Sequence, residues 1–236
     1  MIGIIGAMEA EVELLRSAMK DLRETRIGSF TFYTGRIQDK ETVLLQCGIG
    51  KVQAAVGCAL LLQHFKPQCI INTGSAGGIA AGLHFGDVVI SEGLLYHDVD
   101  VTAFGYLPGQ LPGHPQIFAA DGGLQSKAEQ ALQTLKERGR LPDSLSYQKG
   151  IIASGDIFMH EPEKIIQLRK TFPQVKAVEM EGAAIAHCCT LFSTPFLVLR
   201  ALSDIAGEES PLKFDEFLPI ASRHSSEIVM ELMLQL

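Results

Sequence analysis

Short apolar runs alternate with helical segments along most of this 236-residue chain. The runs IGIIGA (2–7) and CIINT (69–73) have the length and composition of buried strands, whereas the segments 8–20 and 51–65 favour helix. Such an alternation predicts an α/β fold in which helices cover a central sheet. We therefore expect a three-layer, single-domain architecture over residues 1–236, with a mixed, largely parallel central sheet flanked by helices.

The other expected elements continue this alternation, beginning with a hairpin over residues 30–47. Further strands are expected at 87–91, 150–154, 176–180 and 196–202, and further helices at 124–138, 161–170, 182–191 and 214–235. Residues 102–117 hold glycine, proline and aromatic residues without periodicity, which predicts a long ordered loop of the kind that often carries function. The chain contains no linker, internal repeat or low-complexity tract, and this favours one domain.

Charge and composition argue against several classes of protein. The formal net charge is −7 and no run of Lys or Arg forms a basic stripe, which argues against a nucleic-acid or anionic-membrane partner. The five cysteines show no metal-ligand spacing and lie in apolar surroundings, as expected for reduced cysteines of a cytoplasmic protein. The N-terminal stretch lacks the positive charge of a signal peptide, and the longest apolar stretch, around 54–62, is too short to span a bilayer.

Polar residues gather where four of the expected strands end. In open α/β sheets, ligands bind beyond the carboxyl ends of the strands, so these residues are the candidates for function. They are Met8, Glu9 and Glu11 after the first strand, GSAGG (74–78) after residues 69–73, Glu179 to Glu181 around residues 176–180, and Ser203 and Asp204 after residues 196–202.

The segment NTGSAGG (72–78) places three glycines and a serine at a junction between strand and loop. Glycine lets a backbone approach a ligand closely and present its N–H groups, as in loops that bind phosphate. The segment lacks the lysine of a P-loop and the spacing of a dinucleotide fingerprint. A tight turn between sheet and helix explains it equally well.

Each acid has both a functional and a purely structural explanation. Asp204, at a strand end, suits a general acid with a raised pKa, or a helix N-cap. Glu11 suits a carboxylate that orients a water, or an acid that favours the first turn of a helix. Glu179 and Glu181 share one face if the strand extends that far, and a carboxylate can accept hydrogen bonds from two vicinal hydroxyls. The alternative is a buried acid paired with Arg200 or with a lysine.

His97, Asp98 and Asp100 are residue types that bind metals. Three residues so close in one strand rarely form a site, because they do not all share a face. We expect neither a metal nor a cofactor.

Eight motifs occur together in one order: IGIIGAMEAEVELL, CGIGKV, INTGSAGG, YHDVDVTAFGYLPGQLPG, SGDIF, VEMEGAAIAH, RALSD and FDEFL. In these motifs the chain resembles, from end to end, the 5′-methylthioadenosine/S-adenosylhomocysteine nucleosidase family of the nucleoside phosphorylase superfamily. The resemblance implies a single nucleosidase domain, usually a homodimer, that hydrolyses the N-glycosidic bond of adenine thionucleosides. It further implies roles in methionine salvage and in recycling of S-adenosylmethionine.

The resemblance also implies four catalytic residues. Asp204 protonates adenine N7 so that the base leaves as a neutral group, and Ser203 helps to hold Asp204. Glu11 and Arg200 position the attacking water.

For the substrate, the resemblance implies that Glu181 binds the ribose hydroxyls. Glu179 is either a sugar-side acid or an acid that supports the site from behind, paired with Arg200. Phe158 stacks on adenine, Met180 packs against the sugar, and Met159 is a mild departure from the branched residue of many relatives. The other implied substrate contacts are Ser75, Ala76, Gly77 and Val178 around base and sugar, Met8, Ile49 and Phe214 around the 5′-alkylthio tail, and Val101, Phe104, Tyr106 and Pro112 of a loop that reaches the neighbouring subunit.

The acids favour hydrolysis over phosphorolysis, the other chemistry of the superfamily. Glycosidic cleavage passes through an oxocarbenium-like state, so an acid at the base and carboxylates near the sugar stabilise both ends. Glu11, where the nucleophile would lie, should repel a phosphate dianion but not water. Two alternatives stay open: a relative that cleaves 6-amino-6-deoxyfutalosine, and a catalytically inactive relative on the same fold.

Overall fold

This computed structural model describes residues 1–205 and 216–236 and the backbone of 210–215. Ten strands between Ile2 and Ile205 form one sheet. The elements are β1 (Ile2–Gly6), α1 (Glu9–Ser17), β2 (Lys20–Ile27), β3 (Phe30–Ile37), β4 (Lys40–Gln46), α2 (Lys51–Phe65), β5 (Ile70–Gly78), β6 (Val88–Tyr96), the 3-10 helix η1 (Thr102–Phe104), β7 (Phe118–Ala119), α3 (Gly122–Glu137), β8 (Tyr147–Ser154), α4 (Pro162–Thr171), β9 (Val175–Glu179), α5 (Gly182–Leu191), β10 (Phe196–Ile205) and α6 (Ser210–Gln235). The fold class predicted from the sequence, an α/β fold with a mixed sheet and flanking helices, is confirmed.

The sheet closes on itself at one end. Its strand order is β10-β6-β8-β9-β5-β1-β4-β3-β2, and β10 also pairs with β5, so that β5, β10, β6, β8 and β9 form a ring. Five of the ten pairings among the described strands are parallel and five are antiparallel. The sheet is therefore mixed as predicted, but parallel pairings make up half of it rather than most.

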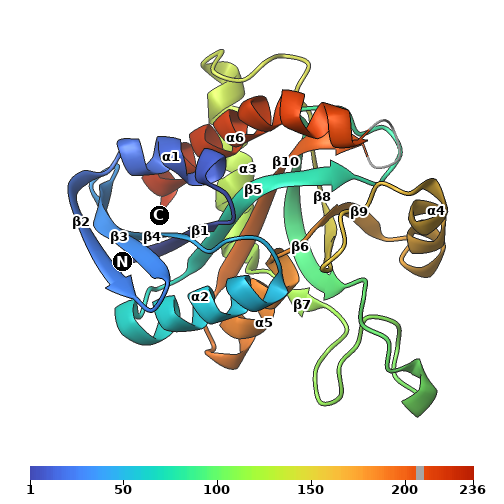
Figure 1. Ribbon diagram of the computed structural model, residues 1–236. Helices are drawn as coiled ribbons and strands as arrows, with labels where there is room; N and C mark the ends of the chain where they lie inside the picture. The colour runs from blue at the N-terminus through green and yellow to red at the C-terminus, as the bar shows by residue number, and fades with distance from the viewer. Residues whose placement is uncertain (206–209) are drawn as a thin grey trace.

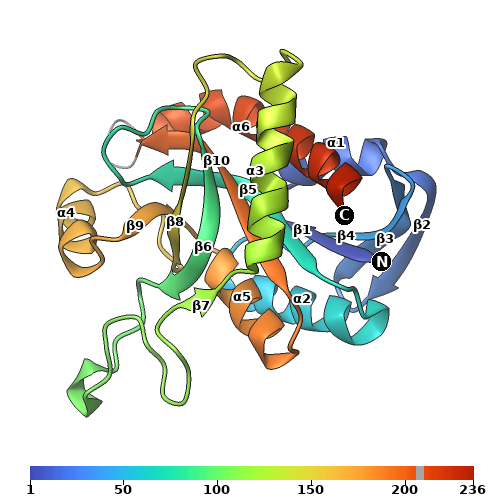
Figure 2. The same ribbon diagram turned by 180° about the vertical axis from the view of Figure 1, so that it is seen from behind.

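Helices cover both faces of the sheet (Figures 1 and 2): α1, α3 and α6 lie on one face, and α2 and α5 on the other. Strand β1 shows why the sequence specifies two cores. Successive residues of a strand point to opposite faces, so Ile4 packs with the α1, α3 and α6 side and Ile5 with the α2 and α5 side. A strand buried on both faces carries no polar alternation, which is the pattern of IGIIG.

Three elements differ from the prediction. Residues 20–27 form β2, whereas the expected helix ran to residue 20 and no element was expected over 21–27. The residues of β2 are almost all exposed and so lack the apolar alternation of a half-buried strand. The segment 74–78, expected as a loop, continues β5 to Gly78 and is buried throughout. The last strand likewise continues past residue 202 to Ile205. Small and polar residues at these strand ends concealed the extensions.

The long loop predicted over residues 102–117 is present and begins earlier, at residue 97. It projects from the body of the molecule (Figure 1), and the short helix η1 is its one regular element. Phe104 at its tip is 81% exposed. Among the helices of the described residues, none has the length and apolar character needed to cross a membrane.

Candidate active site

A cavity of about 430 Å³ lies where β5, β9 and β10 end and α1 and α5 begin. Its volume lies within the range of small-molecule sites. The predicted residues that line it are Met8, Glu11, Ile49, Ser75, Ala76, Gly77, Phe158, Met159, Val178, Glu179, Met180, Glu181, Ser203 and Asp204. Segments far apart in the sequence therefore meet at one place, as the positions at strand ends predicted.

The Glu11 carboxylate is held by four hydrogen bonds. The backbone N–H groups of Ala7 and Met8 donate to Oε2 at 2.9 and 3.0 Å, and the N–H and hydroxyl of Ser75 donate to Oε1 at 2.9 and 3.0 Å. Gly74 lets the carboxylate come this close, because a Cβ there would lie 2.6 Å from Oε1. Glu11 thus fits both explanations, because its carboxylate accepts a hydrogen bond at the start of α1 and also lines the cavity.

Asp204 lies inside β10, so the helix N-cap considered from the sequence is wrong. The register between β10 and β5 shifts between Leu202 and Asp204, which places Asp204 opposite Gly77. Irregularities of this kind re-aim side chains near binding sites. The Ser203 hydroxyl donates to Asp204 Oδ1 at 3.1 Å, and both residues are buried at the cavity wall.

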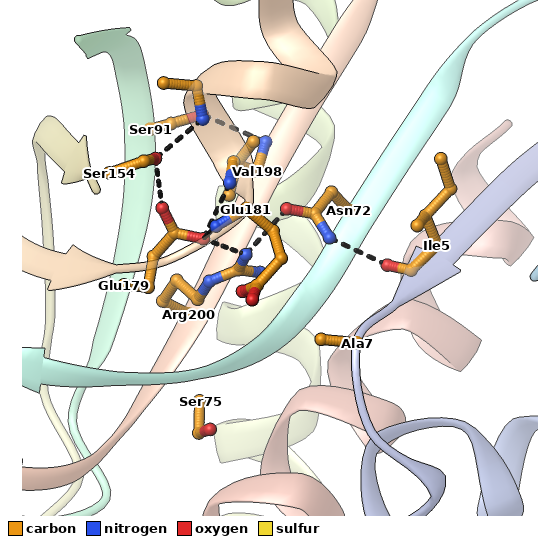
Figure 3. Close-up of polar contacts among 12 residues, drawn as sticks. Ile5, Ala7, Asn72, Ser75, Ser91, Ser154, Glu179, Glu181, Val198 and Arg200 are labelled. Atoms are coloured by element: carbon orange, nitrogen blue, oxygen red, sulfur yellow. Dashed lines mark hydrogen bonds and ion pairs between the residues drawn. The ribbon is translucent and has the colours of Figure 1, made fainter. Parts of the chain in front are cut away.

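Glu179 belongs to a chain of polar contacts that crosses five strands (Figure 3). Ser154 of β8 donates to Glu179 at the end of β9, Arg200 of β10 donates to Glu179 and, at 2.7 Å, to Asn72 of β5, and the Asn72 amide donates to the carbonyl of Ile5 in β1 at 2.9 Å. The structural alternative considered from the sequence, a buried acid paired with Arg200, therefore holds for Glu179, and both side chains of the ion pair are buried. Arg200 does not line the cavity; it lies behind the carboxylates.

Glu181 differs from its neighbour. Strand β9 ends at Glu179, and Glu181 occupies the N-cap position of α5, so the two acids do not share a strand face as the sequence suggested. The one hydrogen bond found for its carboxylate among the described residues comes from the Gly50 N–H, at 2.8 Å from Oε1. Burial, followed by repulsion from Glu179, raises the pKa of Glu181 to about 8, although Arg200 and the Gly50 N–H oppose the rise. Figure 3 shows its carboxylate beside the Arg200 side chain.

Apolar side chains complete the cavity. Met159, Val178 and Met180 lie in its wall, whereas Ile49 and Phe158 are 53% and 40% exposed. An acidic pocket with a partly exposed apolar border suits a ligand that has both polar and apolar parts.

The remaining predicted residues lie elsewhere. Val101, Phe104, Tyr106 and Pro112 belong to the projecting loop and do not line the cavity within this chain. The side chain of Phe214 lies outside the described residues. No group of three His, Cys, Asp or Glu side chains in the described part of the chain converges as a metal site requires.

Several residues of the site escaped the sequence analysis. Ala7 and Ile157 line the cavity, but small or apolar residues beside a motif carry no distinguishing signal. Asn72 and Ser154 support Glu179 and Arg200 from other strands. Both stand within apolar runs near strand ends, and an isolated polar residue in such a run is the signal that could have found them.

Comparison with known proteins agrees with this geometry. Residues 1–233 match the model of the phosphorylase superfamily. A 5′-methylthioadenosine/S-adenosylhomocysteine nucleosidase of Geobacillus kaustophilus (strain HTA426) is 52% identical over 230 residues, which cover 98% of this chain and 95% of that protein.

Solved structures give the same result. The Neisseria meningitidis 5′-methylthioadenosine/S-adenosylhomocysteine nucleosidase in complex with methylthio-immucillin-A has a TM-score of 0.94 at 46% identity, covering 100% of this chain and 99% of that one. A futalosine hydrolase mutant of Helicobacter pylori has a TM-score of 0.91 at 31% identity, covering 100% and 99%. This chain therefore belongs to the phosphorylase superfamily and, within it, to the family of 5′-methylthioadenosine/S-adenosylhomocysteine nucleosidases.

Proposed function

We propose that the chain, acting over residues 1–236 as a single nucleosidase domain, hydrolyses the N-glycosidic bond of 5′-methylthioadenosine and S-adenosylhomocysteine. The products are adenine and the thioribose, and 5′-deoxyadenosine is a further substrate. The observation that carries the proposal is the convergence of Glu11, Glu181 and Asp204 on one cavity. In the cell this reaction serves methionine salvage and recycling of S-adenosylmethionine in the cytoplasm.

Asp204 acts at the base. Its protonated carboxyl gives a proton to adenine N7 as the bond between N9 and C1′ breaks, so that the base leaves without negative charge. The Ser203 hydroxyl, which donates to Oδ1, fixes the orientation of the carboxyl group. Phe158 stacks on adenine and Met159 lies beside it, in agreement with their places in the cavity lining.

Glu11 acts at the nucleophile. Its carboxylate orients a water and accepts a proton as the water oxygen bonds to C1′. The four protein donors use the acceptor sites of both Glu11 oxygens, so the water takes the place of one of them, and the rotatable Ser75 hydroxyl is the donor that yields. Arg200 contributes through its buried positive charge, which acts on Glu11 and Glu181 from behind the wall.

Glu181 binds the ribose hydroxyls, because it lines the cavity and its carboxylate accepts one hydrogen bond from the described residues, which leaves acceptor capacity for a ligand. Met180 packs against the sugar, and Ser75, Ala76, Gly77 and Val178 line the region of base and sugar. Glu179 contributes indirectly, since its oxygens are engaged by protein donors. No cofactor takes part.

The 5′ substituent contacts Met8 and Ile49 of the cavity lining and, as the family resemblance implies, Phe214. The projecting loop supplies Val101, Phe104, Tyr106 and Pro112 to the site of a second copy in a homodimer. A projecting loop with an almost fully exposed Phe104 supports this role, because large exposed aromatic side chains are common at protein interfaces.

A second candidate is cleavage of 6-amino-6-deoxyfutalosine, alone or together with the thionucleosides. The likeness to the Helicobacter pylori futalosine hydrolase supports it, at lower identity than the thionucleosidases.

The test is adenine release from methylthioadenosine, S-adenosylhomocysteine, 5′-deoxyadenosine and aminodeoxyfutalosine, each with and without phosphate. We expect phosphate-independent release from the two thionucleosides. A requirement for phosphate would refute hydrolysis, and release from aminodeoxyfutalosine alone would replace the first candidate by the second.

A further inference from the structure

Three charged residues from separate motifs form a cluster beside the cavity. The Lys51 ammonium donates to Asp98 Oδ2 at 2.6 Å, the Lys51 backbone N–H donates to Asp156 Oδ1 at 2.8 Å, and the Asp156 N–H donates to the same Asp98 oxygen at 2.9 Å. The cluster therefore ties together the start of α2, the start of the projecting loop and the segment just before Phe158.

This cluster is continuous with the substrate cavity through Gly50. The N–H of Gly50 donates to Glu181, and the N–H of the next residue, Lys51, donates to Asp156. Two consecutive N–H groups at the N-terminus of α2 thus bind carboxylates from two other segments. Helix α2 has no acid in its own first turn and no side-chain cap, so these carboxylates take that place.

Gly50 can serve in this way because its φ is +98°, a conformation that L side chains rarely adopt. A Cβ at this position would also lie 3.1 Å from Asp156 Oδ1. Glycine therefore permits the backbone turn in which the N–H of residue 50 reaches Glu181 and the N–H of residue 51 reaches Asp156.

The Lys51–Asp98 pair is partly withdrawn from solvent, with side chains 23% and 13% exposed. Burial opposes the charge of Asp98, but hydrogen bonds from Lys51 and from the Asp156 N–H outweigh it and lower the pKa of Asp98. The Lys51 ammonium also lies 5.5 Å from the centre of the Tyr96 ring, within reach of a cation–π contact. Such a pair fixes a geometry more firmly than an exposed one.

We propose that Lys51, Asp98 and Asp156 are positioning residues of the active site, which hold the Gly50 N–H on the Glu181 carboxylate and fix the segment that carries Phe158. The inference rests on the proposed role of Glu181 as the acid that binds ribose as a carboxylate. It gives a function to the CGIGKV, HDVD and SGDIF motifs beyond the residues that line the cavity.

The test is the pH dependence of kcat/KM for methylthioadenosine in Lys51→Met. Without the cluster, the Gly50 N–H no longer stabilises the ionised form of Glu181, and the acid limb moves to higher pH. At pH values below the acid limb, kcat/KM of Lys51→Met should be about tenfold lower than that of wild type, which is the size of one lost charge-assisted hydrogen bond. At pH values above the limb, the two should have similar kcat/KM. Lys51→Arg should restore the wild-type profile.

Arg36→Met is the matched control, since it removes an exposed ion pair with Asp21 on the β2–β3 hairpin and should leave the profile unchanged. If Lys51→Met does not fold, Asp156→Ala provides the same test, because that side chain is 49% exposed. An unshifted acid limb, or a loss that is equal at every pH, would overturn the proposal.

Hydrogen exchange at the Gly50 amide is the readout that does not depend on activity. It should be about tenfold faster in Lys51→Met than in wild type, and unchanged in Arg36→Met. If the wild-type chain released no adenine, the proposed function would fail, and an unchanged exchange rate would separately overturn the positioning role.

Discussion

Glu179 and Glu181 stand two residues apart in one wall of the cavity, yet their surroundings are opposite. Glu179 accepts hydrogen bonds from Ser154, from Arg200 and from the N–H groups of residues 181 and 182. Within the described part of the chain, the Glu181 carboxylate accepts one, from Gly50. Closeness in sequence therefore says little about the role of a buried acid; the number and charge of its donors says more. The fully bonded acid stabilises the wall, and the other keeps acceptor capacity for a ligand.

The cost of removing each acid should differ accordingly. A buried ion pair that loses one partner leaves an uncompensated charge in the interior. Glutamine in place of Glu181 removes a charge that burial and Glu179 already disfavour. Replacement of Glu179 should thus lower the stability of the fold, whereas replacement of Glu181 should lower catalysis.

The largest effect is expected at Asp204, which extends the comparison to an acid required as a donor. Asp204→Asn should lower kcat by about 10³-fold or more, since an amide cannot act as a general acid, while the nucleoside still binds. Single-turnover kinetics and equilibrium binding measure the two quantities. Asp143→Asn, at an exposed position, is the control. Near-normal turnover in Asp204→Asn would refute the acid role.

The second-largest effect is expected on folding stability, when the Glu179–Arg200 ion pair is broken. Glu179→Gln should lower the free energy of unfolding by about 3–5 kcal/mol, because Arg200 would remain buried without its anionic partner. Urea denaturation monitored by circular dichroism measures the change. Glu181→Gln serves as the comparison and should unfold no more easily than wild type. Equal losses in the two variants would break the contrast between the acids.

The activity of Glu181→Gln should fall about 100-fold in kcat/KM, the size of one or two hydrogen bonds to a charged acceptor. A substrate that lacks the ribose 2′-hydroxyl tests whether Glu181 contacts that hydroxyl. On that substrate the penalty for the substitution should shrink, because the donor is already missing. A penalty of the same size on both substrates would show that Glu181 does not contact that hydroxyl.

The smallest expected effect is on the number of protons released when a nucleoside binds. The pKa of Glu181 is raised from 4.5 to about 8, so the folded chain keeps a proton that the unfolded chain loses, and the stability due to Glu181 falls as pH rises from about 4.5 to about 8. A nucleoside whose hydroxyls donate to Glu181 favours the carboxylate. Its binding near pH 7 should release up to about one proton more than adenine does. Calorimetry in buffers of different ionisation enthalpy measures this difference, and Glu181→Gln should abolish it.

The alternation of short apolar runs and helical segments was enough to predict the fold class. It was enough because IGIIG is a short apolar run of strand length and the segment that follows it has apolar residues at helical spacing. Closure of the sheet was not predictable, since the pairing of β10 with β5, and of β9 with β5, brings together strands that are far apart in the chain. Nothing local in Val175–Glu179 specifies its antiparallel neighbour.

The sequence predicted the acids that line the cavity, but it did not predict the residues that hold them in place. Glu11, Asp204 and Glu181 stand out as acids beside apolar runs, and all three line the cavity. Gly50 and Asp156 gave no such signal, because their function depends on backbone direction and on segments more than a hundred residues apart. The roles of the acids stay predictions until the variants above are measured.

Strand β2 has consequences for solubility. Among the described strands, β2 is the edge strand at the end of the sheet far from the ring, and it pairs with β3 on one side only. A strand edge of unpaired N–H and C=O groups is a template for aggregation. Seven of the eight residues of β2 are exposed, and KDLRETRI places both signs of charge along it. Another chain that added itself to this edge would have to desolvate those charges, so the same composition that hid β2 from sequence analysis protects the enzyme from edge-to-edge assembly.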